Sequence, residues 1–118
     1  MSAVELNARA TAGFEQRVES AIAVLREAAT THAGRIVQAT SLGAEDMVLT
    51  DLIARHELPI AIATLDTGKL HAETLALIPR IEARYRRAVE VFRPADTAVI
   101  HFVRQHGERA MFESIDLR

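Results

Sequence analysis

Apolar positions follow two different spacings along the chain, and these spacings predict helices and strands in alternation. Four segments repeat apolar side chains every three or four residues, as one face of a helix does: 13–31, 44–56, 71–86 and 94–107. Three short apolar runs lie between them and predict strands: 35–40, 60–65 and 89–92. Pro79 falls inside the third helical segment, where it removes a backbone hydrogen bond, so we expect a kink or a break there.

This alternation predicts an α/β fold, because helices between strands are typical of a parallel sheet with right-handed crossovers. Residues 60–65 are almost wholly apolar, which predicts an interior strand covered on both faces and hence three layers. Glu90 interrupts the third strand and indicates an outer position, giving the strand order 3-2-1. Residues 1–34 are expected to form an N-terminal helical segment, and residues 35–118 part of the α/β domain.

Strand one would then lie at an edge where a further strand should dock, and no later segment supplies that strand. An unpaired strand edge recruits partners, so the chain is expected to form a homo-oligomer. The alternative is a monomer in which residues 110–118 fold back over that edge.

Composition limits the remaining possibilities. The chain has 118 residues, no cysteine and a formal net charge of −2. No basic face favours nucleic acid, no apolar run approaches a membrane span, and no secretory signal is present, so a cytoplasmic protein with no nucleic-acid or membrane partner is expected. Without cysteine the chain has no disulfide, no thiolate metal ligand and no thiol chemistry.

The turn after the first strand is the first candidate site. Ser41, Leu42, Gly43 and Ala44 lie where this strand passes into a helix, whose first N–H groups have no partner within the helix and can bind phosphate or sulfate. The alternative is an ordinary turn in which Ser41 or Thr40 caps the helix. Two acidic residues of the first helical turn complete the stretch and are expected to oppose the helix dipole: Glu45 and Asp46.

The turn after the second strand is the second candidate site, since carboxyl ends of parallel strands share one edge of a sheet. Leu65 is a candidate apolar contact for an adenine, and Asp66 a candidate acceptor for a ribose or a neighbouring loop. Thr67 and Gly68 form the turn, and Lys69 is a candidate phosphate contact. The alternatives are a core position for Leu65, an Asx turn for Asp66 and a solvated Lys69.

No metal site is expected, because none of the five histidines pairs at the spacing of a helical zinc site. Neither a Gly-x-Ser-x-Gly elbow nor a Walker-type Gly-Lys-Ser/Thr motif occurs, so hydrolase and P-loop kinase functions lack support.

The two turns together resemble the sulfonucleotide reductases, the phosphoadenylyl-sulfate and adenylyl-sulfate reductases of the PP-loop superfamily. The resemblance rests on Ser-Leu-Gly-Ala-Glu-Asp over 41–46, on Leu-Asp-Thr-Gly-Lys-Leu-His-Ala-Glu-Thr over 65–74, and on Phe-Val-Arg-Gln-His-Gly over 102–107. It extends from about Arg35 to Arg118. The fold it implies is half of a doubly wound, adenine nucleotide α-hydrolase-like domain. It also implies that 41–46 hold the phosphosulfate side of the nucleotide and that 65–68 border the adenosine.

The resemblance further implies the reduction of adenylyl sulfate or 3′-phosphoadenylyl sulfate to sulfite in sulfate assimilation. In that family a cysteine attacks sulfur and thioredoxin discharges the thiosulfonate, and a cysteine pair helps to ligate a 4Fe-4S cluster in the adenylyl-sulfate branch, which this chain resembles more. None of these cysteines is present here. The chain therefore resembles the N-terminal, nucleotide-binding half of a truncated reductase, with no cofactor and no activity of its own.

Two alternatives remain. The chain is a non-catalytic domain that binds an adenine nucleotide or a protein partner, or it is an ATP pyrophosphatase-type transferase of the PP-loop superfamily.

Overall fold

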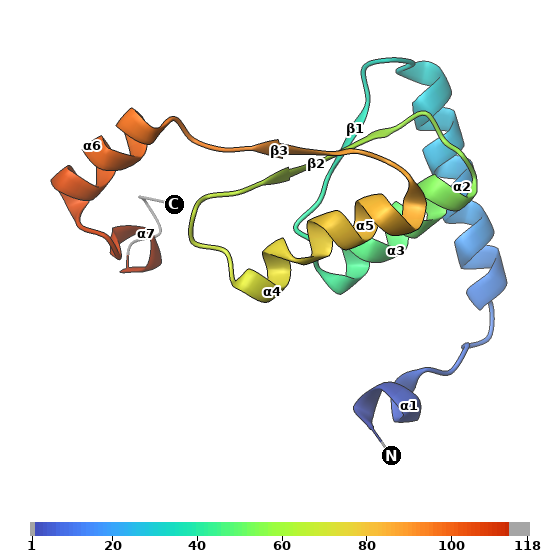
Figure 1. Cartoon of the computed structure of the whole chain (residues 1–118). Coiled ribbons are helices and arrows are strands. Elements are labelled where there is room, and N and C mark those ends of the chain that lie inside the picture. The colour runs from blue at the N-terminus through green and yellow to red at the C-terminus, as the bar shows by residue number, and fades with distance from the viewer. Residues whose placement is uncertain (1, 114–118) are drawn as a thin grey trace.

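The computed structural model describes residues 2–113, which contain short helices at both ends and an alternating α/β region between them (Figure 1). The elements in chain order are α1 (Ala3–Asn7), α2 (Phe14–Thr31), β1 (Val37–Ala39), α3 (Ala44–Arg55), β2 (Ala61–Leu65), α4 (Ala72–Leu75), α5 (Leu77–Tyr85), β3 (Val89–Phe92), α6 (Asp96–His106) and α7 (Ala110–Glu113). The last five residues of the domain expected over 35–118 lie outside the described range.

The three strands form one parallel sheet in the order β1-β2-β3. Val37 is aligned with Ala61 across the first pair, and Leu65 with Phe92 across the second. The predicted α/β class, the strand order and the outer position of the strand that carries Glu90 are therefore confirmed.

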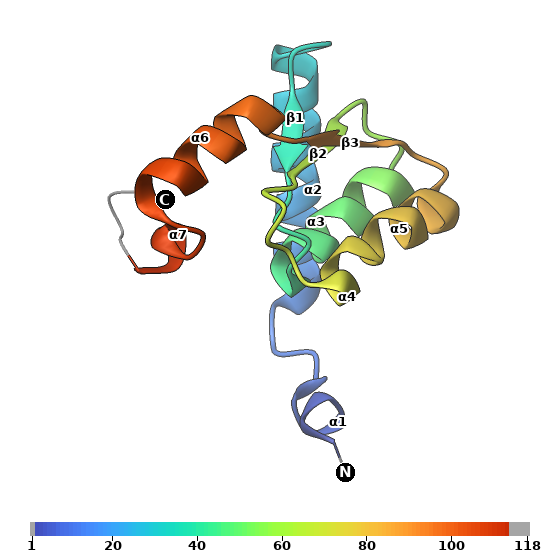
Figure 2. The same ribbon diagram turned by 60° about the vertical axis from the view of Figure 1, so that its left-hand side comes forward.

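Helices α3 and α5 cover one face of this sheet (Figures 1 and 2). The buried side chains of this interface are Leu42, Ile62, Ile78, Ile81 and Val89. Helix α2 packs beside α3 and closes a second buried cluster of Ala29, Ile53, Leu58 and Ile60. The core of the molecule lies in these two clusters, on one side of the sheet.

The opposite face is uncovered within residues 2–113, so the expected third layer is not formed there and the prediction that β2 is covered on both faces is wrong. Successive residues of a strand point to opposite faces, and the register therefore places one set of side chains on the uncovered side. We call this set the open face: Val37, Ala39, Ala61, Ala63, Leu65, Glu90 and Phe92. Leu65 is 68% exposed and Phe92 is 56% exposed. The apolar run of β2 does not lead to burial on both faces, because Ala61 and Leu65 are exposed although their side chains are apolar.

The predicted break at Pro79 is confirmed. Helices α4 and α5 are separate, with Ala76 between them, and Pro79 lies in the first turn of α5. A proline there removes no bond of α5, but its ring would clash with the carbonyl of Leu75 if the helix continued.

Two short helices were not expected from the hydrophobic pattern. Helix α1 is begun by a capping box, in which the Ser2 hydroxyl accepts from Glu5 N and the Glu5 carboxylate accepts from Ser2 N. The Ser-x-x-Glu spacing is a sequence signal for such a start. The other helix is α7, which follows Gly107.

Helix α6 extends beyond the carboxyl end of β3 and lies away from the sheet in both views (Figures 1 and 2). Among the described residues, no helix is long and apolar enough to cross a membrane.

Candidate functional site

The carboxyl ends of β1 and β2 lie side by side, as expected. The Thr64 hydroxyl donates to the Thr40 carbonyl at 2.8 Å, and both threonine side chains are buried. At the next strand, the Asp66 N–H donates to the Phe92 carbonyl at 2.9 Å. The turns after β1 and β2 are thus joined at one edge of the sheet.

The turn after β1 depends on a leucine in the left-handed region. Leu42 has φ 65°, which is uncommon for a residue with a branched side chain. Its side chain is buried in the α3–α5 cluster, and its N–H donates to the Thr40 hydroxyl at 2.9 Å. Core packing and this hydrogen bond therefore hold a backbone conformation that the local sequence disfavours.

Asp46 fastens the same turn from the helix side. Its Oδ2 accepts from the Ser41 N–H at 2.6 Å and from the Ser41 hydroxyl at 2.7 Å. The backbone N–H of Ser41, and then its hydroxyl, hold the pKa of the Asp46 carboxyl below its ordinary value of 3.8. This carboxylate is bonded to the turn and so has a structural role besides the expected one near the helix dipole.

The N-terminus of α3 has no side-chain cap. Gly43 is the N-cap residue, with φ −74° and ψ 170°, and no side chain bonds to the first helical N–H groups. Ser41 instead accepts from Gly43 N at 3.2 Å, so the alternative of a helix capped by Ser41 or Thr40 is wrong. The backbone N–H groups of Ala44 and Glu45 belong to the first turn of α3, and such groups are the ones that bind anions at a helix N-terminus.

Gly43 allows a ligand to come close to the backbone, because it has no side chain. Its φ and ψ angles are ones that any residue can adopt. A Cβ added there would lie 3.1 Å from the Ser41 hydroxyl and 3.5 Å from a Glu45 carboxylate oxygen. A larger side chain would therefore disturb Ser41 and cover the start of α3.

The turn after β2 is fastened by Asp66, which is 9% exposed. Its Oδ1 accepts from the Gly68 N–H at 2.9 Å, and its Oδ2 accepts from Arg93 Nε at 3.1 Å. The Asx-turn alternative is confirmed, and Thr67 contributes a further turn bond to the N–H of Lys69 at 3.3 Å. Arg93 follows β3, so Asp66 ties the ends of β2 and β3 together.

Lys69 reaches toward the C-terminal helices. Its Nζ lies 3.1 Å from Glu108 Oε1. The pair is partly exposed, with 35% of the Lys69 side chain and 74% of the Glu108 side chain accessible. In this conformation the lysine charge is balanced by a carboxylate, and Lys69 is not simply solvated as the alternative had it.

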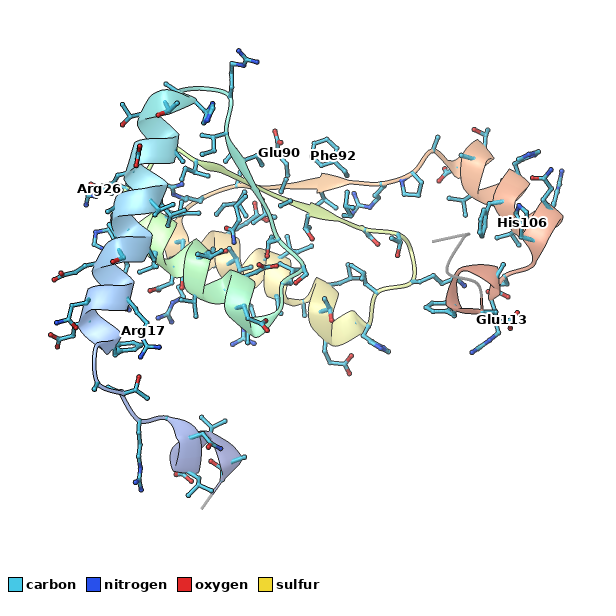
Figure 3. All side chains as sticks on the ribbon, turned by 180° about the vertical axis from the view of Figure 1, so that it is seen from behind. Arg17, Arg26, Glu90, Phe92, His106 and Glu113 are labelled. Atoms are coloured by element: carbon cyan, nitrogen blue, oxygen red, sulfur yellow. The ribbon has the colours of Figure 1, made fainter. Side chains whose placement is uncertain are left out.

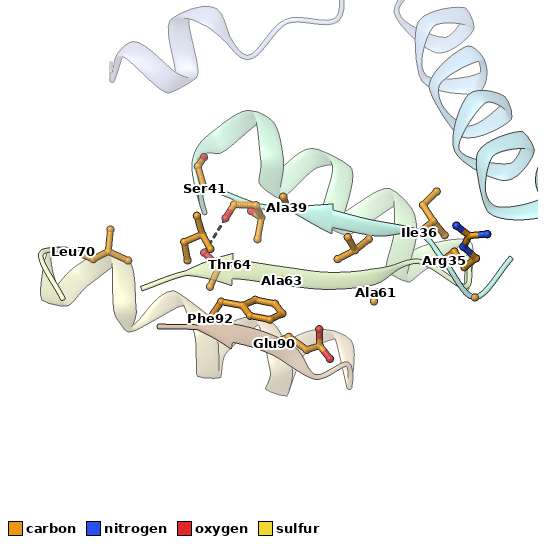
Figure 4. A pocket seen from close by; sticks show the side chains of 14 residues that line it. Arg35, Ile36, Ala39, Ser41, Ala61, Ala63, Thr64, Leu70, Glu90 and Phe92 are labelled. Carbon is orange, nitrogen blue, oxygen red and sulfur yellow. Dashed lines mark hydrogen bonds between the residues drawn. The ribbon is translucent and has the colours of Figure 1, made fainter. Parts of the chain in front are cut away.

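A hollow of about 780 Å³ lies on the open face and reaches the two turns (Figure 4). At the carboxyl end of the sheet its lining combines hydroxyl groups with apolar side chains: Thr40, Ser41, Thr64, Leu65, Leu70 and Phe92. Leu65 and Phe92 are aligned across β2 and β3, so they form an exposed apolar pair beside the turns. The alternative that Leu65 is a core residue is wrong.

The residues present do not fit an iron–sulfur cluster, because the chain has no cysteine. In residues 2–113, no group of three histidine, aspartate or glutamate side chains is placed to bind a metal ion.

Four residues near the site were missed by sequence analysis: Thr64, Leu70, Phe92 and Arg93. Phe92 and Arg93 end the third strand, so the rule that ligands bind at carboxyl ends of parallel strands was the available signal. Thr64 gave no signal, since its role depends on a bond to the neighbouring strand.

Fold and site together define an α/β protein in which two turns at adjacent carboxyl ends of a parallel sheet flank an uncapped helix start. This arrangement is typical of proteins that bind nucleotides or other anions. Residues 35–116 match the family described as phosphoadenosine phosphosulfate reductase domain, and the chain belongs to this family.

Several similar proteins are named adenosine 5′-phosphosulfate reductase. The protein from Burkholderia cepacia is 43% identical over 102 residues, which cover 86% of this chain and 40% of that protein. The protein from Allochromatium vinosum is 48% identical over 83 residues, which cover 70% of this chain and 32% of that protein. A protein from Neisseria meningitidis is 49% identical over 81 residues, which cover 68% of this chain and 33% of that protein. The chain therefore spans well under half the length of these relatives.

Proposed function

We propose that this chain binds the adenine nucleotide of a sulfonucleotide reductase, with adenylyl sulfate or 3′-phosphoadenylyl sulfate as the ligand. The observation that carries the proposal is the uncapped start of α3 beside the turn after β2. The names of the similar proteins support adenylyl sulfate as the first ligand to test.

In this proposal the phosphosulfate lies at the first turn of α3. The N–H groups of Ala44 and Glu45 supply donors, and Gly43 lets the anion come close. The negative charge of Asp46 is partly balanced by the two hydrogen bonds that its Oδ2 accepts from Ser41.

The adenosine lies against the apolar pair Leu65 and Phe92 of the open face. An exposed aromatic ring offers a flat surface on which a base can stack. Asp66 lies at the same edge, with Gly68 and Arg93 holding its carboxylate in place, and we expect a remaining lone pair of this carboxylate to accept from a ribose hydroxyl.

Reduction of the bound nucleotide requires a thiolate to attack sulfur, and thioredoxin to release sulfite afterwards. No residue of this chain provides that thiolate. We therefore expect the 118-residue polypeptide to release no sulfite above background when it is incubated with thioredoxin and either substrate. Sulfite formation by the purified chain would contradict this assignment of roles.

Calorimetry with adenylyl sulfate, its 3′-phosphorylated form and AMP tests the binding. We expect both sulfonucleotides to bind more tightly than AMP, because only they place a phosphosulfate at α3. We expect Gly43→Val to weaken their binding at least about tenfold, since its side chain covers the helix start. Val48→Ala is the matched control, because Val48 is an exposed residue of the same helix. Unchanged binding in Gly43→Val would place the site elsewhere.

The lack of cysteine also favours a second function, a nucleotide-binding or interaction domain with no chemistry of its own. A cysteine-bearing partner polypeptide that restores sulfite release would favour the split reductase over this second function. Formation of AMP and pyrophosphate from ATP would instead favour a pyrophosphatase-type transferase.

A further inference from the structure

One ion pair joins the turn after β2 to the C-terminal helices. Lys69 Nζ lies 3.1 Å from Glu108 Oε1, and the two residues are 39 positions apart in the chain. Glu108 lies between α6 and α7, and neither helix makes an extensive contact with another described helix or strand. Figure 3 shows His106 and Glu113 of these helices well apart from Phe92 on the sheet. Among the described side chains, the pair is therefore the main tie between the candidate site and the C-terminal helices.

The backbone of Lys69 is held at the mouth of the hollow. The Asp66 carboxylate accepts from the Gly68 N–H at 2.9 Å. The Thr67 hydroxyl accepts from the Lys69 N–H at 3.3 Å, and Leu70, the next residue, lines the hollow. The side chain of Lys69, in contrast, ends in an ammonium group on a flexible stem of four carbons. Lys69 can therefore change the partner of its charge while its backbone stays in place.

The carboxyl edge of the sheet carries more carboxylates than cations. Glu45 and Asp46 lie in the first turn of α3, and Asp66 follows β2. The guanidinium of Arg93 is paired with Asp66 at 3.1 Å. Lys69 is paired instead with a carboxylate whose side chain is 74% accessible, and an exposed pair of this kind is weak because water screens it. An anion bound at this edge can therefore take Lys69 from its partner at little cost.

We propose that Lys69 exchanges Glu108 for a phosphate oxygen of the bound nucleotide, so that nucleotide binding releases α6 and α7 from the turn after β2. The proposal rests on the nucleotide-binding function proposed above, and it couples that site to the C-terminal helices through one lysine. The nucleotide and the Glu108 carboxylate compete for the same ammonium group. Each therefore weakens the binding of the other by the same factor.

Calorimetry of adenylyl sulfate binding at low salt tests the competition. We expect Glu108→Gln to tighten binding by about two- to fivefold, because the nucleotide no longer displaces a carboxylate. Lys69→Gln should weaken binding at least about threefold, and Glu108→Gln should have no effect in the Lys69→Gln background. Glu113→Gln is the matched control, since it removes the same charge from an exposed position of α7, and we expect it to leave the affinity unchanged.

A distance measurement between two spin labels tests the release of the helices. Val24→Cys on α2 and Ile100→Cys on α6 replace exposed residues, and the absence of native cysteine makes the two labels unique. We expect adenylyl sulfate to broaden the distribution of distances between these positions. In the Glu108→Gln background the distribution should be broad without the nucleotide. Labels at Val24→Cys and Val48→Cys, on the packed helices α2 and α3, should show no change.

The exchange is overturned if Glu108→Gln binds adenylyl sulfate no more tightly than Glu113→Gln, or if its gain persists in the Lys69→Gln background. The release of the helices is overturned if adenylyl sulfate binds and the distances between positions 24 and 100 keep their distribution. In each of these cases the nucleotide-binding function still stands where Gly43→Val weakens binding. Failure of the parent chain to bind any of the nucleotides overturns both proposals together, so the two failures are distinguishable.

Discussion

The two faces of the sheet differ more in burial than in the hydrophobicity of their residues. Ile62 on the covered face is 2% exposed, whereas Leu65, three residues later in the same strand, is 68% exposed. Both are large aliphatic residues in one apolar run. The difference shows that hydrophobicity alone does not make a core position, because burial requires a partner element on the same side of the strand.

Substitution of the two residues gives the sharpest contrast. Ile62→Ala removes side-chain atoms from a fully packed cluster, and we expect it to lower the free energy of unfolding by about 2–5 kcal/mol. Leu65→Ala changes an exposed side chain, so we expect a change within about 0.5 kcal/mol. Urea unfolding followed by circular dichroism measures both. Equal losses would mean that the Leu65 side chain is buried in solution.

Thr64→Val tests the bond that joins the two candidate turns. The variant keeps the shape of the side chain but leaves the Thr40 carbonyl without this buried donor, and we expect a loss of about 1–2 kcal/mol. Thr31→Val is the control, because Thr31 is an exposed threonine at the end of α2. A neutral Thr64→Val would show that β1 and β2 hold the edge together without the hydroxyl.

Asp46→Asn tests the contribution of the turn after β1 to stability across pH. The folded pKa of Asp46 is lowered, so its stabilising contribution is present above the unfolded value near 3.8 and is lost as pH falls through the folded pKa. We expect the parent chain to lose more stability than Asp46→Asn when pH falls from about 5 to below 3.8. Thermal unfolding at several pH values measures the difference. Glu45→Gln, one residue earlier in the same helical turn, is the matched control for the loss of one negative charge.

Lys69→Ala should give the smallest effect. The ion pair with Glu108 is largely exposed, so we expect a change of about 0–1 kcal/mol, further reduced by salt. A double-mutant cycle with Glu108→Ala isolates the interaction. A coupling well above this range would show that the pair fastens the C-terminal helices to the turn after β2.

Sequence analysis was most reliable where the signal was local. The helices over 44–56 and 71–86 and the strand at 89–92 follow from spacing, and the structure has their bounds within one residue. The break follows from proline sterics and lies at Ala76, three residues before Pro79. The capping box at Ser2 was also local, and it was missed only because no apolar repeat accompanies it.

The candidate site was predicted in part. The positions of Ser41–Asp46 and of Leu65–Lys69 at one edge follow from strand order, and this placement was correct. The bonds within the site did not follow, because Asp46 reaches back to Ser41 and Arg93 reaches across from β3. Such bonds depend on the geometry of whole elements.

The sequence by itself determined the parallel α/β class, the strand order and the family, since these depend on the order of short patterns and on two motifs. The tertiary structure alone decided which face of the sheet is covered and where α6 lies. It also decided that Leu42 takes a left-handed conformation, because burial of its side chain with Ile62 and Ile81 offsets the local strain. These features depend on contacts between residues far apart in the chain, and their energies are not encoded in any one segment.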